Sequence, residues 1–400
     1  MKNESPKYRF DKFNENWIIV KLSDIACHYK TGGTPSTKDP TFWGGAIPWI
    51  QSSDIQKDRL FGVIPQKFIS EEGLQNSTAK LIPKNSIAIV TRVGVGKLAI
   101  IDQDYTTSQD FLSLSDFNGD TQFIAYSIYR MLQKESTQLQ GTSIKGITKE
   151  DLLLKKISLP EIEEQSAIGS LFRTLDNLLS SYKDNLANYQ SLKATMLSKM
   201  FPKAGQNVPE IRLDGFEGEW EIKRADEIFK SVSEKNKAFL PVLSASQIDG
   251  MVLRDEIGIN IKYDEAILNN YKVVKPGQFV IHLRSFQGGF ALSKLEGITS
   301  PAYTIIDFID KENNLSDFWN SILTSRDFIK RLETVTYGIR DGKSISFKDF
   351  SSLKFVFPEF KEQQAIGAYF SNLDNLINSY QEKISQLVIL KKKLLQDMFI

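Results

Sequence analysis

Cysteine and histidine are scarce in this chain of 400 residues, which has one cysteine, Cys27, and two histidines. A single cysteine cannot form an internal disulfide, so nothing indicates an oxidising compartment. So few thiol and imidazole groups also leave little for a zinc site or for catalysis by histidine. No apolar run is long enough to span a membrane, and the first residues lead into no signal-peptide core. We therefore expect a cytoplasmic protein.

An excess of charge of one sign is also lacking, because 50 basic residues balance 49 acidic ones. Residues 1–160 carry a net charge of +3, from 20 basic and 17 acidic residues, and residues 207–357 carry −2, from 20 basic and 22 acidic residues. This balance excludes a uniformly basic nucleic-acid-binding surface but not a localised basic groove. We expect any binding of DNA by this chain alone to be weak.

The chain contains an internal repeat. Residues 160–183 return as residues 358–381 with 14 identities in 24 positions, and Met200-Phe201 returns as Met398-Phe399 at the same offset of 198. The segment from Arg9 to Trp17 is echoed more weakly from Arg212 to Trp220 at an offset of 203. The sequence therefore predicts two copies of one unit, each a divergent globular part followed by a well-matched helix.

Each repeated helix carries an apolar stripe, because apolar residues recur mostly at steps of three and four. A helix of this length extends about 60 Å, more than a small domain spans. Two helices with the same stripe most simply pair as an antiparallel coiled coil. The alternative is that each packs only on its own globular part. The stripe residues are Ile168, Leu171, Leu175, Leu178, Tyr182, Leu186, Tyr189, Leu192, Met196 and Met200, with Ile366, Tyr369, Leu373, Leu376, Tyr380, Ile384, Leu387, Leu390, Leu394 and Met398 as mates.

The globular parts mix strand and helix signals. Residues 87–101 read as two β-strands around a glycine turn, whereas residues 122–139 and 315–336 read as helices. The expected fold class is α+β, with two globular domains separated by two long helices in a pseudo-twofold repeat. The expected boundaries are a first domain at 1–160, a first helix at 161–201, a linker at 202–209, a second domain at 210–357 and a second helix at 358–400.

Glycine, proline and tryptophan gather in residues 32–50. Such a loop can place aromatic rings and hydroxyls on a ligand, or it can be a stabilised loop whose tryptophans are anchors in the core. For Trp43 and Trp49 we favour the anchoring role.

The segments Gly32-Gly33-Thr34-Pro35-Ser36 and 42–50, together with the helix starts 160–168 and 358–366, are similar to those of type I restriction-modification DNA specificity subunits. The resemblance covers essentially the whole chain. It implies that each globular part is a target recognition domain for one half of a bipartite, asymmetric DNA sequence. It also implies that the helices act as spacers and bind two methyltransferase subunits, and that the chain is not an enzyme. The second copy departs from the first, because it lacks the Gly-Gly-Thr-Pro loop.

Partners and cofactors follow from the same resemblance. The implied partners are double-stranded DNA and two adenine-N6 methyltransferase (M) subunits, and a restriction/translocase (R) subunit is left open. No membrane is involved. This chain needs no cofactor or metal, since S-adenosylmethionine, ATP and magnesium are expected on partner subunits. The implied location is the cytoplasm of a bacterium or archaeon.

The candidate DNA-binding residues are polar residues at matched loop positions. Arg92 and Arg284 each follow a β-prone run and precede a glycine turn. Arginine can bind the O6 and N7 atoms of guanine, or a phosphate. The full candidate set is Arg92, Lys97, Thr107, Ser108, Gln109, Thr142, Ser143, Lys145, Arg284, Gln287, Thr299, Ser300, Arg340 and Lys343.

The candidate partner-binding residues repeat between the two helices without belonging to the apolar stripe. We expect these polar residues to be exposed. They are Gln165, Asp176 and Asn177 with their mates Gln363, Asp374 and Asn375.

Two alternatives stay open. The first is a coiled-coil scaffold with two ligand-binding domains that does not touch DNA. The second is a metal nuclease using Asp214, Glu221 and Lys223, although the repeat mate of this segment lacks such residues. The chain has no Asn-Pro-Pro-Tyr or Asp-Pro-Pro-Tyr motif of amino-methyltransferases, so methyl transfer is expected on a partner.

Overall fold

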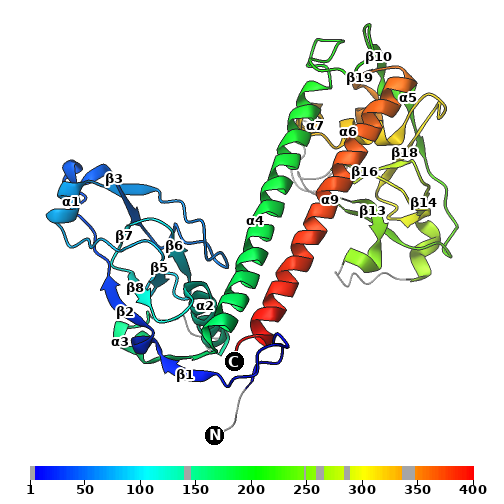
Figure 1. The fold of residues 1–400 in the computed structure, drawn as a ribbon. Helices are drawn as coiled ribbons and strands as arrows, with labels where there is room; N and C mark the ends of the chain where they lie inside the picture. The colour runs from blue at the N-terminus through cyan, green and yellow to red at the C-terminus, as the bar shows by residue number, and fades with distance from the viewer. Residues whose placement is uncertain (1–4, 139–145, 247–248, 258–264, 283–288, 336–346) are drawn as a thin grey trace. The chain divides into compact units, whose positions relative to one another are not determined.

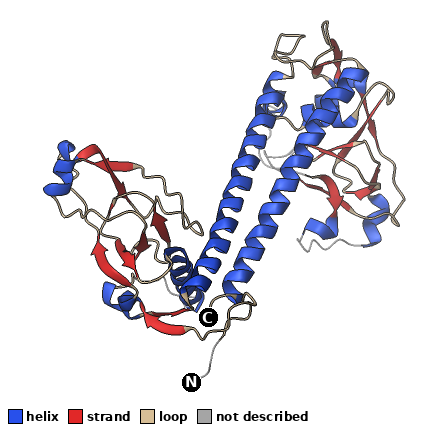
Figure 2. Cartoon of the chain, in the orientation of Figure 1, coloured by secondary structure: helices blue, strands red, loops and turns tan. Residues whose placement is uncertain are grey.

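The computed structural model describes residues 5–138, 146–246, 249–257, 265–282, 289–335 and 347–400. The chain divides into two compact units (Figure 1). Unit 1 comprises residues 1–185 and 380–400, and unit 2 comprises residues 186–379. Two long helices, α4 (Ile162–Lys199) and α9 (Phe360–Asp397), each pass from one unit into the other. The strands come before α4 in unit 1 and between α4 and α9 in unit 2 (Figure 2).

Unit 1 is built on an antiparallel sheet of four strands in the order β2-β8-β5-β6. The middle strand β5 is buried on both faces. Ile87 and Ile89 point into the core with helix α2, whereas Ala88 and Val90 point into a second apolar cluster with Ile50. The strands are β2 (Ala26–Thr31), β8 (Phe111–Phe117), β5 (Ser86–Val90) and β6 (Leu98–Ile101), and α2 spans Thr121–Gln138.

Unit 1 also has two smaller sheets, one of three strands and one of two. β3 (Trp43–Ile50) pairs antiparallel with β4 (Lys67–Ile69) and parallel with β7 (Thr106–Thr107). β1 (Ile18–Lys21) pairs antiparallel with β9 (Lys156–Leu159), which leads into α4. The remaining short helices are α1 (Glu71–Gln75), α3 (Lys149–Leu154), η1 (Leu22–Asp24) and η2 (Pro40–Phe42).

Unit 2 repeats the four-stranded sheet in the order β11-β18-β15-β16. Its middle strand is again buried on both faces, with Phe279 and Ile281 in the main core and Val280 in a second cluster. The strands are β11 (Phe229–Val232), β18 (Thr304–Phe308), β15 (Phe279–Ile281) and β16 (Phe290–Leu292). The internal repeat of the sequence is therefore a repeat of sheet topology.

Outside that sheet, unit 2 differs from unit 1. Where unit 1 has the long strand β3, unit 2 has a short hairpin of β12 (Leu243–Ser246) and β13 (Gly250–Leu253). β14 (Lys272–Val274) pairs with β17 (Gly297–Thr299), and β10 (Glu221–Arg224) pairs with β19 (Lys354–Phe357). The helices are α5 (Ala225–Ile228), α6 (Ser316–Leu323), α7 (Arg326–Val335), α8 (Phe347–Ser351), η3 (Arg254–Ile257) and η4 (Glu265–Asn270).

Within unit 1, the first half of α4 lies antiparallel to the last turns of α9. Tyr182 contacts Tyr380 with ring centroids 5.4 Å apart, and Phe172 contacts Phe399 at 5.4 Å. The residue number falls along one helix as it rises along the other. Phe399 also stacks on Phe123 of α2 at 5.2 Å, so the C-terminal end of α9 completes the core of this unit.

Unit 2 repeats this arrangement with the helices exchanged. Phe201, just after α4, stacks on Phe370 of α9 with ring centroids 6.0 Å apart and contacts Phe318 of α6 at 5.8 Å. Lys193 forms an ion pair with Asp374 further along the same helices. The repeated Met-Phe pairs at the helix ends are therefore core residues, and the antiparallel pairing of the helices is confirmed.

The phase of the predicted apolar stripe is partly wrong. The buried seam of α4 follows Ile168, Phe172, Leu175 and Leu179, and its mates in α9 are Ile366, Phe370, Leu373 and Ile377. Steps of four, three and four keep these positions on one line along a paired helix. Four residues of the predicted stripe are exposed: Leu178, Leu192, Leu376 and Leu390.

The predicted hairpin at 87–101 is confirmed as β5 and β6, and the helix predicted at 122–139 is α2. The segment 315–336 is not one helix, because α6 ends at Leu323 and α7 begins at Arg326. Thr324 and Ser325 between them hydrogen-bond back to the last turn of α6 or to α7, which suits short polar side chains at helix ends.

Candidate nucleic-acid interface

Three segments of unit 1 meet at Thr91, the residue that follows β5. The Thr91 N–H donates to Asp110 O at 2.7 Å, and the Ile147 N–H donates to Thr91 O at 2.7 Å. Thr91 Oγ1 also donates to Asp110 O at 3.0 Å. The turn after β5, the residues before β8 and the segment before α3 are therefore held side by side. We use the name Thr91 edge for four residues of these or adjoining segments: Thr34, Arg92, Val93 and Gln109.

The Thr91 edge presents an arginine and an apolar side chain to solvent. Arg92 is exposed, and Val93 is 74% exposed. Gly94 and Gly96 follow with φ angles of +89° and +92°, a conformation that side chains other than glycine rarely adopt. The tight turn fixes where Arg92 leaves the sheet. Val93 is not among the residues expected to bind DNA, although its place between an arginine and two turn glycines is a usable signal in the sequence.

Gln109 adds an amide to this edge. It is exposed, and its Oε1 atom accepts a hydrogen bond from Thr34 Oγ1 at 2.5 Å. Arginine and glutamine are the side chains that bind guanine and adenine edges in bidentate fashion. Lys97 contributes less, because its Nζ atom donates to Ser52 O at 3.2 Å and so braces the turn.

Thr107 and Ser108 do not fit the expectation of a direct contact with DNA. Thr107 is fully buried and Ser108 is 5% exposed. Thr107 belongs to β7, and the Ser108 N–H donates to Ile50 O at 3.0 Å. A Cβ atom at Gly32 would lie 2.0 Å from Ser108 O, so Gly32 is needed for close packing of the backbone. These hydroxyl residues hold the sheet beneath the Thr91 edge.

The corresponding residues of unit 2 show the same role. Thr299 is fully buried and its Oγ1 atom donates to Leu243 O at 3.1 Å, so the expected DNA contact does not fit here either. Ser300 is half-buried, and its Oγ atom accepts a hydrogen bond from the Ala302 N–H at 3.3 Å. Seven candidate DNA-binding residues lie outside the described residues: Thr142, Ser143, Lys145, Arg284, Gln287, Arg340 and Lys343.

The tryptophans of residues 32–50 are structural anchors, as favoured from the sequence. Trp49 is 4% exposed, and its Nε1 atom donates to Gly33 O at 2.9 Å. Trp43 packs edge-on against Trp49 and donates from Nε1 to Ser36 O at 3.0 Å. The Gly-Gly-Thr-Pro segment is thereby fastened to β3, next to the Thr34 end of the Thr91 edge.

Gln165 and Gln363 are not the exposed residues that the sequence predicts. They are 5% and 1% exposed. Gln165 accepts from the Asp120 N–H at 3.0 Å and donates to Pro160 O at 2.8 Å. Gln363 accepts from the Leu315 N–H at 3.1 Å and donates to Pro358 O at 3.0 Å. Each amide joins the start of a long helix to the segment before α2 or α6, because these buried backbone groups need partners.

The buried carboxylates beside these glutamines are also structural. Glu164 and Glu362 are fully buried, and each accepts two hydrogen bonds from an arginine, Arg9 or Arg212, at 2.7 and 2.8 Å. Hydrogen bonding to Glu164 and Glu362 raises the pKa of Arg9 and Arg212 above the ordinary value of an arginine. The repeat of arginine at an offset of 203 therefore reflects a clamp that ties each unit's first segment to a long helix.

The four other candidate partner-binding residues differ in exposure. Asn177 and Asn375 are exposed, as expected. Asp176 is 9% exposed and accepts from Lys391 Nζ at 2.5 Å, whereas Asp374 is 45% exposed and pairs with Lys193. Asp176 is therefore part of the helix pair in unit 1, which corrects the expectation that it is free for a partner.

The residues of the nuclease alternative are not arranged as a metal site. Glu221 and Lys223 of β10 form an ion pair with each other at 3.0 Å. Within the ranges that the structure describes, no three His, Cys, Asp or Glu side chains are grouped so that they could hold a metal ion. Over the same ranges, no helix has the length and the apolar composition needed to cross a membrane.

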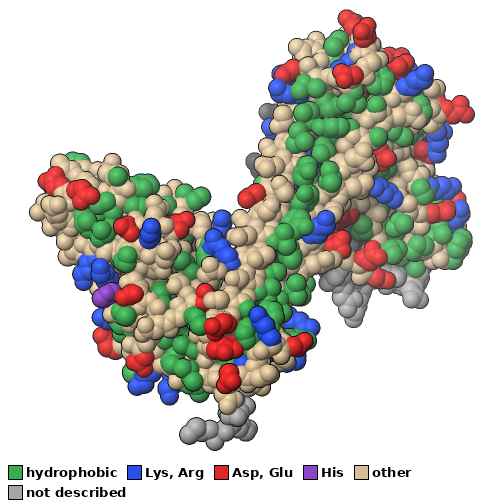
Figure 3. All heavy atoms as spheres, in the orientation of Figure 1, with side chains coloured by type: hydrophobic (Ala, Val, Ile, Leu, Met, Phe, Trp, Pro, Cys, Tyr) green, Lys and Arg blue, Asp and Glu red, His purple; other side chains and the backbone are tan. Residues whose placement is uncertain are grey.

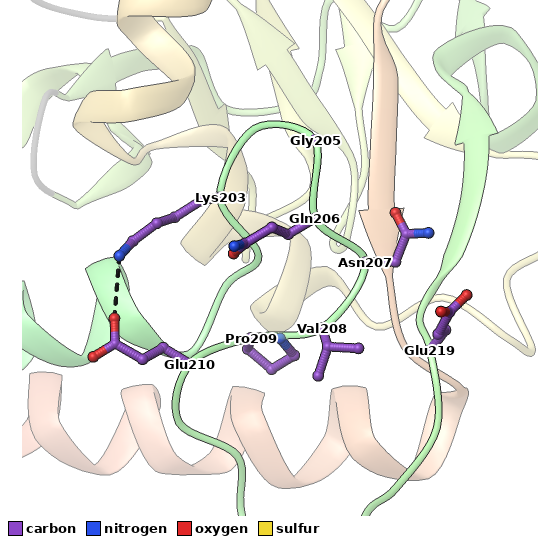
Figure 4. A pocket seen from close by; sticks show the side chains of 8 residues that line it. All are labelled: Lys203, Gly205, Gln206, Asn207, Val208, Pro209, Glu210 and Glu219. Carbon is purple, nitrogen blue, oxygen red and sulfur yellow. Dashed lines mark hydrogen bonds and ion pairs between the residues drawn. The ribbon is translucent and has the colours of Figure 1, made fainter.

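An open hollow of about 530 Å³ lies in unit 2 along the segment that connects α4 to β10 (Figure 4). Glu210 lies between Lys199 and Lys203, whose Nζ atoms are 2.9 and 3.1 Å from its carboxylate. These hydrogen bonds lower the pKa of Glu210. Because Lys203 and Glu210 of its wall are paired with one another, we assign this hollow no ligand. It is lined by Lys203, Gly205, Gln206, Asn207, Val208, Pro209, Glu210 and Glu219.

The two units have the same sheet order, and each contains parts of the same two helices. The protein is therefore a tandem-repeat α+β protein with paired helices. The family described as the type I restriction modification DNA specificity domain matches residues 14–188 and again residues 217–388. The chain belongs to this family.

Several curated proteins are similar to this chain. The type I restriction enzyme MjaIX specificity subunit of Methanocaldococcus jannaschii is 25% identical over 56% of this chain and 54% of its own length. The EcoR124I/EcoR124II specificity subunit of Escherichia coli is 31% identical over 44% of this chain and 45% of its own length. The chain thus spans about half the length of these two relatives. The MjaVIII specificity subunit is 23% identical over 95% of this chain and 91% of its own length.

Solved structures share the fold. A crystal structure of a type I restriction-modification system S subunit from M. genitalium aligns over 99% of both chains with a TM-score of 0.63 and 16% identity. A chain from a structure of complex assembly and conformational transition of the type I R-M system aligns over 97% of this chain and 98% of its own length, with a TM-score of 0.52 and 18% identity. These likenesses concern the fold alone.

Proposed function

We propose that this chain is the DNA-reading subunit of a type I restriction-modification complex. In this proposal each unit reads one half of a bipartite, asymmetric DNA target. The observation that carries the proposal is the repeated sheet, β2-β8-β5-β6 in unit 1 and β11-β18-β15-β16 in unit 2, joined to the same paired helices. Two equivalent scaffolds of one family suit two equivalent tasks.

The differences between the units support an asymmetric target. Unit 1 presents the Thr91 edge beside the long strand β3, whereas unit 2 has the short β12-β13 hairpin at the corresponding place. Since base edges are read by the side chains that reach them, unlike surfaces read unlike sequences. Phosphate contacts fix the register but need positive charge. Because the two units carry net charges of opposite sign, we expect partner subunits to supply much of that attraction.

The long helices offer two matching surfaces for partner subunits. In unit 1, Leu178 is 40% exposed and Leu390 is 43% exposed; in unit 2, their mates Leu376 and Leu192 are 42% and 37% exposed. Hydrophobic side chains are visible along the solvent-facing side of these helices in Figure 3. Exposed apolar residues at repeated positions are typical of a protein interface. Two copies of one surface support the binding of two adenine-N6 methyltransferase subunits.

Catalysis lies on the partners in this proposal. S-adenosylmethionine, magnesium and ATP belong to the methyltransferase subunits and to a restriction/translocase subunit where one is present. The reading subunit supplies only sequence recognition and assembly. The cytoplasm of a bacterium or archaeon is the proposed location.

Exchanging one unit tests the assignment of one half-site to each unit. Residues 1–157 are replaced by those of a relative with a different target, and the assembled complex is used to methylate host DNA. We expect one half of the methylated motif to change while the other half stays the same. A change in both halves or in neither would contradict the proposal. An intact complex that methylates no defined motif would favour the scaffold alternative.

A further inference from the structure

Two large apolar side chains are more exposed than the others in the described part of the chain. They are Phe239 of unit 2, at 82%, and Val93 of unit 1, at 74%. Each lies in a turn, Val93 directly after Arg92 and Phe239 two residues after Lys237. Exposing a phenylalanine ring forgoes the free energy of burying it, so its position calls for a function.

We propose that Phe239 is a DNA-contacting residue of unit 2, whose ring packs against the bases of the target while the neighbouring lysines bind phosphates. This inference rests on the proposed function, since it assigns a residue to the DNA half-site read by unit 2. Phenylalanine contacts the thymine methyl group in the major groove, or wedges between base steps in the minor groove.

The turn that carries Phe239 is held in one conformation. The Leu240 N–H donates to Lys237 O at 3.0 Å, and the Asn236 N–H donates to Asn269 O at 3.1 Å. Ala238 and Leu240, on either side of Phe239, pack against a buried cluster. Because both neighbours are anchored, Phe239 projects outward without the loss of chain entropy that a flexible loop would suffer on binding. The cluster comprises Leu268, Tyr271, Val273 and Ile298.

The charges around this turn favour a polyanion over a protein surface. Lys235 and Lys237 flank Asn236 in the turn. Lys275 lies near Lys237, because both form ion pairs with Glu234. Glu234 holds Lys237 and Lys275 at 2.7 Å each, which lowers the pKa of this carboxyl to about 2. Burial and repulsion by Lys235 lower the pKa of a fourth lysine, Lys272.

Four lysines therefore face three carboxylates, those of Glu234, Glu296 and Asp307, and Asp307 is also paired with Lys311. Residues 207–357 carry a net charge of −2, so this is a local positive patch on an otherwise acidic unit. A positive patch around an exposed aromatic ring is the arrangement found where proteins hold nucleic-acid backbones and bases together.

The test compares Phe239→Ala with Ile309→Ala, which removes another exposed apolar side chain of unit 2, one that is 50% exposed. Both variants are assembled with the methyltransferase partner, and their binding to a duplex with the motif mapped for the unaltered complex is measured. A scrambled duplex serves as the reference. Since base–aromatic contacts are worth a few kcal/mol, we expect Phe239→Ala to weaken target binding roughly tenfold or more. Phe239→Leu should recover part of the loss, and Ile309→Ala should match the unaltered complex.

A second pair of variants separates the ring from the charges. Lys235→Gln and Lys237→Gln should weaken binding to the target and to the scrambled duplex alike, and each should lower the salt dependence by about one charge. If Phe239→Ala binds the target as the unaltered complex does, the proposal for Phe239 is overturned. If it instead loses a partner subunit with DNA binding otherwise intact, Phe239 belongs to a protein interface. An unaltered complex that recognises no motif would contradict the proposed function itself, which is a distinguishable outcome.

Discussion

Lys391 Nζ lies 2.5 Å from Asp176 Oδ1, and the two side chains are only 8% and 9% exposed. Asp176 also accepts a hydrogen bond from the Tyr126 hydroxyl at 2.5 Å, and Lys391 donates to Asp58 O at 3.3 Å. The pKa of Tyr126 lies far above its ordinary range, mainly because the hydroxyl is buried and secondly because the negative charge of Asp176 is close to it. At the repeat offset of 198, the mate of this pair is Lys193 with Asp374, which are 30% and 45% exposed. The same ion pair is therefore buried in unit 1 and half-exposed in unit 2.

This difference predicts unequal costs of removing the two lysines. Lys391→Met leaves the Asp176 carboxylate buried without its cation, so we expect the free energy of unfolding to fall by about 3 kcal/mol or more. Lys193→Met removes a half-exposed pair, whose carboxylate water can still solvate, and should cost less than about 1 kcal/mol. Urea unfolding of the two variants measures both values. Equal losses would contradict the structural distinction between the pairs.

Stability is expected to depend on pH through His282, which is half-buried. Burial lowers the pKa of His282 below its ordinary value. Between the lowered pKa and the ordinary value of about 6.5, the unfolded chain binds more protons than the folded chain, so stability falls as the pH falls through this window. We expect the melting temperature to drop less between pH 7.5 and pH 5.5 in His282→Gln than in the unaltered protein. His28→Gln, which replaces the histidine at an exposed position, is the matched control.

Replacing Arg92 is expected to reduce sequence specificity in one half-site only. Removal of a base-contacting arginine costs about 1–3 kcal/mol and relaxes the preference at the base it reads. We expect Arg92→Ala to weaken binding of the assembled complex to its target and to admit other bases at one position. Lys80→Ala removes an exposed charge of the same unit and should leave the motif intact. Unaltered binding by Arg92→Ala would favour the scaffold alternative and make the Thr91 edge structural.

Replacing the exposed leucines of the helices is expected to change the number of methyltransferase subunits bound per chain. Leu178→Asp together with Leu390→Asp places two charges on the partner surface of unit 1, and we expect one methyltransferase subunit per chain in place of two. The mates Leu376→Asp and Leu192→Asp should remove the other subunit. Native mass spectrometry counts the subunits. Lys183→Asp, about 140° around the helix from Leu178, is the control and should retain both. Retention of both subunits by either leucine variant would show that partners bind elsewhere.

The sequence predicts the fold well where a residue has a repeat mate at a fixed offset. The two helices and their pairing follow from positions such as Leu175 and Leu373, which are buried in both copies. The paired strands at 87–101 follow from two β-prone runs around a glycine turn. The exact phase does not follow, because Leu178 and Leu179 are both apolar and only tertiary packing selects Leu179 for the seam.

The candidate site is less accessible to sequence reasoning. The repeat of Gln165 as Gln363 indicates that this glutamine has a role in both copies. The sequence alone does not distinguish a buried structural role from an exposed partner-binding role. Thr107 carries a hydroxyl that could reach a base, yet the strand pairing that buries it involves Ile50, which is remote in sequence. The exposure of Arg92, Val93 and Phe239 depends in the same way on which neighbouring residues are anchored. The domain ranges and the DNA contacts stay predictions.

Co-expression of this chain with its methyltransferase partner, followed by base-resolution mapping of N6-methyladenine in the host DNA, tests the central proposal most directly. The proposal predicts a new methylated motif that is asymmetric and split into two parts by an unread gap. A stable complex that produces no such motif would contradict the assignment of this chain as the DNA-reading subunit.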